Sequence, residues 1–114
     1  MRNRPEMSNL MQESKCCPLE ILLSHLSGQW TLYIIWVLTT NGELRFGELR
    51  RKIEGISTKV LTERLRMLES QQIIHRHHEP TIPPKVTYSL TNRGKELSES
   101  LDLLYNLAVQ WYGN

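Results

Sequence analysis

Apolar residues recur at helical spacing in the first part of the chain and predict two neighbouring helices. Leucines three and four positions apart predict a helix over residues 20–27. Cys17 would be its N-cap, because the following Pro18 is tolerated in a first helical turn, and Gly28 would end it. Residues 30–39 are apolar almost all round, which predicts a central, buried helix.

Two further helices separated by a tight turn are predicted next. The first is short and covers residues 46–53. Its inward side chains are those of Phe46, Leu49 and Ile53. Ser57 is suited to cap the second helix, over residues 58–71, because its hydroxyl can accept a hydrogen bond from an unpaired amide. The buried stripe of this second helix consists of Leu61, Leu65 and Leu68.

A β-hairpin, or wing, is predicted over residues 73–90. Its two β-like runs cover 73–78 and 85–90. Three prolines between these runs cannot join a ladder and force an extended tip. In the second run, residues expected to be buried alternate with residues expected to face solvent. The buried ones are Val86, Tyr88 and Leu90, and the solvent-facing ones are Lys85, Thr87 and Ser89.

The last predicted helix covers residues 92–112, is capped by Thr91 and carries two apolar stripes. One stripe would cover its own domain, and the other would cover a second copy of the chain. The first and last helices thus supply the predicted homodimer interface: Leu19, Leu22, Leu103, Leu107 and Trp111.

Together these elements predict one mainly α-helical domain with a small β-hairpin, a winged helix-turn-helix over residues 16–114. Residues 1–15 show no period and are expected to form a flexible arm. No apolar run approaches the roughly 20 residues needed to cross a bilayer, and the start is polar, so we expect a cytoplasmic protein without a membrane partner. No phosphate loop, nucleophile elbow or carboxylate pair is present, so an enzyme is not expected.

The distribution of charge indicates an anionic partner. The formal net charge is +2, but residues 45–66 hold seven basic side chains against three acidic ones, a net charge of +4. Such asymmetry is typical of nucleic-acid binding. On charge alone, a solvated surface with scattered charges explains the pattern equally well.

Cysteine and histidine spacing argues against disulfide-stapled and metal-binding classes. Cys16 and Cys17 are adjacent, and neighbouring cysteines rarely bond each other, so free thiols in a reducing compartment are expected. His75, His77 and His78 lack the spacing of a structural zinc site, which needs four converging ligands. No metal and no cofactor are expected.

Several short motifs stand in a familiar order: CPLE at 17–20, GQWT at 28–31, RFGELRR at 45–51, GIS at 55–57 and PPKVTYSLT at 83–91. Over about residues 16–112 the chain resembles the HxlR-type transcriptional regulators, winged helix-turn-helix proteins related to the MarR regulators. It departs from them at Gln72, where a glycine is usual, and at Gln29, where a basic residue is usual. The resemblance implies a homodimer that binds double-stranded DNA at a near-palindromic operator, as a repressor or an activator.

On this interpretation the helix over 58–71 enters the major groove and the wing lies along the backbone or the minor groove. The candidate contacts of the recognition helix are Ser57, Thr58, Lys59, Thr62, Glu63 and Arg66. Candidates for phosphate and wing contacts are Arg50, Arg51, Arg76, His77 and Lys85. Lys59 and Arg66 can donate to guanine, whereas Glu63 can accept from cytosine or pair within the helix. Arg64 lies nearer the buried stripe, where a local contact is expected.

Cys17 is a candidate sensor of oxidants or electrophiles, with Cys16 as a second or resolving thiol. A thiol at a helix N-terminus meets unpaired amides and the positive end of the helix dipole, which favour the reactive thiolate. The resemblance strengthens this hypothesis, since several family members sense such species through a cysteine in this position. The effector would then be an oxidant or a small molecule. In the simpler alternative, Cys17 only packs near the dimer interface.

A second class of function stays open, because winged helices also serve as protein–protein interaction modules without binding DNA. In that case Lys59 and Arg66 would contact an acidic protein surface. Retention of a palindromic duplex, and its loss when both side chains are removed, distinguishes the two.

Overall fold

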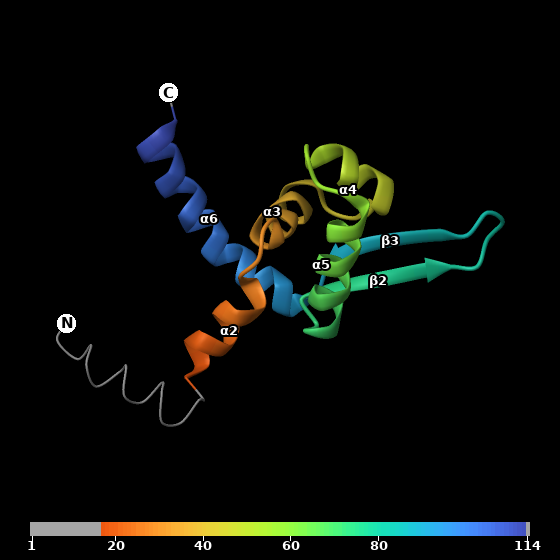
Figure 1. Ribbon diagram of the computed structural model, residues 1–114, viewed down its shortest axis with the longest axis horizontal. Helices are drawn as coiled ribbons and strands as arrows, with labels where there is room; N and C mark the ends of the chain where they lie inside the picture. Colours follow the sequence, from red (N-terminus) through yellow and green to blue (C-terminus); the bar gives the residue numbers. More distant parts are fainter. Residues whose placement is uncertain (1–16, 114) are drawn as a thin grey trace.

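The computed structural model describes residues 17–113 and shows a mainly helical domain with a small sheet (Figure 1). Its helices are α2 (Pro18–Leu26), α3 (Thr31–Asn41), α4 (Phe46–Lys52), α5 (Thr58–Ser70) and α6 (Asn92–Tyr112). Its strands are β1 (Leu44–Arg45), β2 (Ile74–Glu79) and β3 (Lys85–Leu90). The predicted winged helix-turn-helix is confirmed as a fold class, with α4 and α5 as the motif and β2–β3 as the wing.

The hydrophobic core lies where α3, α4, α5 and the sheet meet. From α5 it receives the predicted stripe of buried leucines: Leu61, Leu65 and Leu68. Leu49 in α4 and its C-cap residue Ile53 are fully buried, and Phe46 packs half-buried against the core. Burying one such side chain contributes about 1.5–3 kcal/mol, so these contacts fix the position of α5 against the domain.

Helix α3 is central and mostly buried, as predicted, but one of its apolar faces is exposed. Ile34 and Ile35 are fully buried, whereas Leu32 and Tyr33 are 38% and 47% exposed. The exposed face borders an open apolar hollow of about 600 Å³ between α3 and α6, lined by Leu32, Tyr33, Trp36, Leu101, Leu104 and Tyr105. An apolar pattern marks residues that avoid water. It does not say whether the same chain covers them.

Two non-glycine residues adopt left-handed backbone conformations next to helices. Trp30, at φ 77°, is the N-cap of α3, so the helix begins at Thr31 rather than at residue 30. Gln72, at φ 60°, stands two residues after the end of α5. The Thr91 hydroxyl donates to the Gln72 carbonyl over 2.6 Å and accepts from the Gly94 amide, which confirms Thr91 as the cap of α6.

The sheet has three antiparallel strands in the order β1-β3-β2. The two-residue strand β1 was not predicted, because it is too short to show a period. Its pairing with β3 corrects one expectation about the wing: Thr87, expected to face solvent, is buried. The Thr87 hydroxyl donates to the Glu43 carboxylate just before β1, which satisfies its polar atom.

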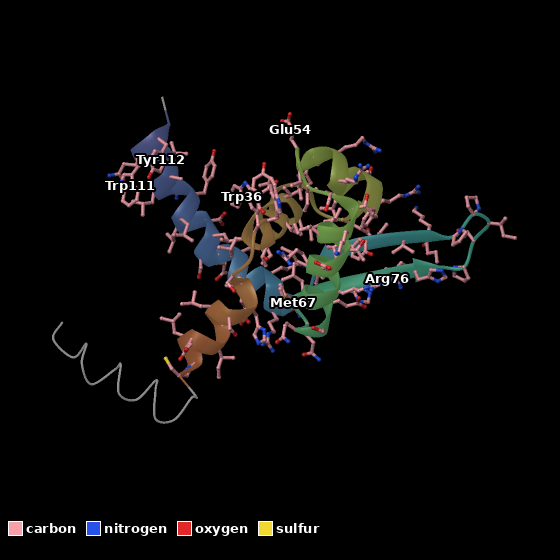
Figure 2. All side chains as sticks on the ribbon, in the orientation of Figure 1. Trp36, Glu54, Met67, Arg76, Trp111 and Tyr112 are labelled. Atoms are coloured by element: carbon pink, nitrogen blue, oxygen red, sulfur yellow. The ribbon has the colours of Figure 1, made fainter. Side chains whose placement is uncertain are left out.

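Helices α2 and α6 extend from the core on the side away from the wing (Figure 1). All five predicted interface side chains are exposed in the single chain: Leu19, Leu22, Leu103, Leu107 and Trp111. Figure 2 shows Trp111 and Tyr112 together near the far end of α6. Among the described helices none alone is long and apolar enough to cross a membrane. Only α2 and α3 taken together, bent by 82° at their junction, reach that length and composition.

Candidate DNA-binding surface

The outward face of α5 is polar and carries charges of both signs. Thr58, Lys59, Glu63 and Arg66 are exposed and Thr62 is half-buried, on the side opposite the leucine stripe. Both ion pairs within residues 17–113 lie on the wing, so Glu63 pairs with neither Lys59 nor Arg66. The charged groups of this face are therefore available to a partner.

The start of α5 is fixed as the sequence predicts. The Ser57 hydroxyl accepts a hydrogen bond from the Val60 backbone N–H over 3.1 Å. The other first-turn amides stand at the positive end of a 13-residue helix, where phosphate oxygens bind well. Ser57 therefore has a defined structural role as a cap, and its own hydroxyl hydrogen is left to donate outward.

Arg64 anchors α5 to the corner between α2 and α3, in agreement with the expected local contact. Its Nε donates to the Gln29 carbonyl over 2.9 Å. Nearby, the Trp30 ring packs over Gly55 in the α4–α5 turn, where a Cβ would stand 3.7 Å from the ring. The orientation of α5 is thus tied to the segment that leads from α2.

The last turn of α4 presents a basic cluster made of Arg50, Arg51 and Lys52. All three side chains are exposed, at the helix end where cations are favourable. Glu48 is occupied at the other end of α4, where its carboxylate accepts the Arg45 backbone N–H over 2.8 Å. Among the described residues the cluster has no acidic partner.

The wing residues separate into two groups. The Glu79 carboxylate lies 3.8 Å from the His77 ring nitrogen and 4.0 Å from the Lys85 ammonium, so it offsets part of the charge of Lys85. Sequence reasoning missed Glu79, although a hairpin register that places it opposite Lys85 would have revealed it. Arg76 neighbours His77 on β2, so its side chain leaves the strand on the opposite face.

Cys17 is the N-cap of α2, as predicted, and is half-buried as a free thiol. Its side chain makes no capping hydrogen bond. Cys16, the predicted second thiol, lies outside the described residues. From Cys17 to Gly113, no group of three or more His, Cys, Asp or Glu side chains is placed to hold a metal ion.

Comparisons with known proteins agree with this geometry. The model of the HxlR-like helix-turn-helix family matches residues 25–114. The uncharacterized HTH-type transcriptional regulator YtfH of Escherichia coli (strain K12) is 40% identical over 96 residues, which cover 84% of this chain and 74% of that protein.

Solved structures show the same likeness. The redox regulator HypR in its oxidized form has a TM-score of 0.76 at 34% identity, over 82% of this chain and 96% of that one. The reduced transcriptional regulator YodB from B. subtilis has a TM-score of 0.73 at 38% identity, over 85% of this chain and 95% of that one. The chain therefore belongs to the HxlR-like helix-turn-helix family of transcriptional regulators.

Proposed function

We propose that this chain is a sequence-specific regulator that binds a near-palindromic DNA operator as a homodimer, with α5 in the major groove. The observation that carries the proposal is the exposed, polar and partly basic face of α5, held by buried leucines behind it. The major groove admits an α-helix and presents a distinct pattern of donors and acceptors for each base pair. Lys59 suits phosphate or guanine, and the unpaired Glu63 suits cytosine.

Further contacts would hold the duplex in register without reading its sequence. At the start of α5, Ser57, Thr58 and the free backbone amides suit phosphate oxygens. Arg50 and Arg51 extend the cationic surface from α4. On the wing, His77 and Lys85 would add weaker contacts, because the Glu79 carboxylate lies within 4.0 Å of both.

The exposed apolar faces of α2 and α6 are the basis for proposing a homodimer. In the single chain Leu103 is 72% exposed and Trp111 is 62% exposed, which is costly in water. A second copy related by two-fold symmetry would cover these faces and set the two copies of α5 on half-sites about 34 Å apart. Bending at α2 or α6 would then change that spacing.

Cys17 is proposed as the sensor because it stands at the start of α2, beside the exposed leucines of that helix. The related proteins include a redox regulator, HypR, and a diamide-treated form of YodB. Diamide would take two electrons and two protons from two thiols to form a disulfide, here between Cys17 and either Cys16 or Cys17 of the second copy, since neighbouring cysteines rarely bond each other. Diamide should release operator DNA from the wild type and not from Cys17→Ser. Equal release from both would end the sensor proposal.

The DNA-binding proposal is tested with fluorescently labelled duplexes from the region upstream of the protein's own gene. The Lys59→Ala, Arg66→Ala double variant should lose at least about tenfold in affinity, because it removes two donors from one face. Lys95→Ala, which removes an exposed lysine from α6, is the matched control and should bind like the wild type. Unchanged binding by the double variant would mean that this face of α5 does not bind the duplex. A wild type that retains no duplex would favour a protein–protein module with an acidic partner.

A further inference from the structure

A polar pocket of about 340 Å³ lies where α5 meets the sheet at the root of the wing. Its walls come from α4, α5, β2 and β3, so segments far apart in the sequence form it. It is lined by Phe46, Thr62, Leu65, Arg66, Glu69, Arg76 and Tyr88. Figure 2 shows Arg76 on β2 beside the end of α5.

The strand register explains why Arg76 enters this pocket. Arg76 stands directly opposite Tyr88 in the β2–β3 ladder, and opposite residues project from the same face of a sheet. Tyr88 is buried on the helix-covered face, as is Ile74, two residues before Arg76. Arg76 therefore points toward α5, whereas His75 and His77 point away from it.

The pocket holds an excess of positive charge. Arg66 and Arg76 contribute two guanidinium groups from separate elements, and Glu69 contributes one carboxylate. Within residues 17–113 none of these three forms an ion pair, and neither arginine donates a side-chain hydrogen bond. With two guanidinium groups and one carboxylate, the pocket keeps a net positive charge, which attracts an anion.

The remaining walls favour a small anion with several acceptor oxygens. Thr62 adds a hydroxyl donor, and Phe46, Leu65 and Tyr88 form an apolar floor. Arg66, Glu69 and Arg76 are themselves exposed, so an anion can reach them directly from solvent. Two guanidinium forks from different directions match a tetrahedral phosphate, which offers oxygens on several sides. The planar edge of a base offers them on one side only.

We propose that Arg66 and Arg76 together bind one phosphate group of the DNA backbone, at the point where the strand passes between the recognition helix and the wing. This inference rests on the proposed function and sharpens it. Arg66 becomes a backbone ligand rather than a base reader, and Arg76 becomes its partner across the pocket. Glu69 limits the affinity of the site by opposing the same phosphate.

The direct test is a scan of the operator duplex with single neutral methylphosphonate linkages. One linkage in each half-site should weaken wild-type binding about tenfold and leave Arg66→Gln and Arg76→Gln unaffected, because their contact is already lost. If every linkage weakens the variants as much as the wild type, the shared phosphate is refuted. The proposed function survives that result as long as the wild type still prefers its operator.

A double-mutant cycle tests independently whether Arg66 and Arg76 share one phosphate. Arg66→Gln and Arg76→Gln should each weaken binding to operator and to unrelated duplex by the same factor. When the two are combined, the loss of affinity should be smaller than the product of the two single losses. Arg66→Gln with Lys85→Gln, an exposed wing lysine outside the pocket, should give the full product. Glu69→Gln should bind both duplexes several-fold more tightly. If Arg66→Gln reduces the preference for operator while unrelated DNA binds as before, Arg66 reads bases and the proposal fails.

A free anion is the other source of a phosphate group, and inorganic phosphate tests it. Phosphate added to the DNA-free protein should perturb the Arg66 and Arg76 side-chain NMR signals and should compete with the duplex. Perturbation without competition would assign the pocket to a free anion and overturn the backbone assignment. A wild type that binds no duplex at all would refute the proposed function, and the backbone phosphate with it.

Discussion

The two ends of the molecule differ in whether their apolar side chains are buried or exposed. At the α4–α5–wing end, the leucines of α5 are buried and the exposed face is polar and basic. At the α2–α6 end, large apolar side chains such as Leu103 and Trp111 face outward. The first end is complete in one chain and leaves its charges exposed to solvent. The second leaves apolar side chains uncovered, and the second copy of the chain that we propose would cover them.

A charge placed on the apolar end should have the largest effect. Leu103→Arg should turn a dimer into a monomer, because an arginine in the proposed interface would be buried without a partner. Operator affinity should fall by about 100-fold or more, since two linked α5 helices gain avidity that one lacks. Sedimentation and duplex titration measure the two effects.

The control for this experiment is Asn92→Arg, an exposed position about three turns earlier on α6. It adds the same charge and should remain dimeric. If Leu103→Arg is also a dimer that binds DNA normally, the apolar end is not the dimer interface.

Removing the hydrogen bond between Arg64 and Gln29, which links the two ends of the molecule, should have an intermediate effect. Arg64→Met removes the hydrogen bond to the Gln29 carbonyl while keeping most of the side-chain volume. We expect the free energy of unfolding to fall by about 1–2 kcal/mol, measured by urea denaturation. Arg66→Met, on the exposed face of the same helix, should change it by less than about 0.5 kcal/mol. Equal stabilities would mean that the Arg64 contact does not hold α5 in place.

The smallest effect is expected at the end of α5. Gln72 has φ 60°, a conformation that costs a side-chain-bearing residue about 1–2 kcal/mol and glycine almost nothing. Gln72→Gly should therefore raise the free energy of unfolding by about 0.5 kcal/mol, after the larger chain entropy of unfolded glycine is subtracted. Gln71→Gly, at φ −89°, gains no such relief and should be destabilising. A loss of stability in Gln72→Gly would contradict this account of the turn.

Local signals in the sequence predicted α5 well. Features that depend on contacts between distant segments were predicted less well. Ser57 and the stripe of Leu61, Leu65 and Leu68 fix the start and the buried face of α5, and both are visible in the sequence. Strand β1 is two residues long and shows no period, so the burial of Thr87 beneath it was missed. Leu32 and Tyr33 were expected to be buried because their helix is apolar almost all round. They are exposed in the single chain, and the apolar pattern does not reveal whether the same chain or another one covers them.

The candidate site also has a part that the sequence predicts and a part that it does not. The exposed cations of α5 follow from helical geometry alone, since a leucine stripe on one side defines the opposite face. The pocket between Arg66 and Arg76 does not, because it depends on the packing of β2 against α5 and on the pairing of Arg76 with Tyr88. The two arginines are ten positions apart in the sequence, and no local pattern relates them.

The measurement that tests the central claim most directly is a salt titration of wild-type binding to two duplexes: the upstream region and a scrambled duplex of equal composition. The account predicts that the upstream duplex binds at least about 1,000-fold more tightly. It also predicts that both affinities fall steeply as salt increases, because cations on α4, α5 and the wing release counterions from the backbone. Equal affinity for the two duplexes, or binding that does not respond to salt, would contradict sequence-specific recognition by the basic face of α5.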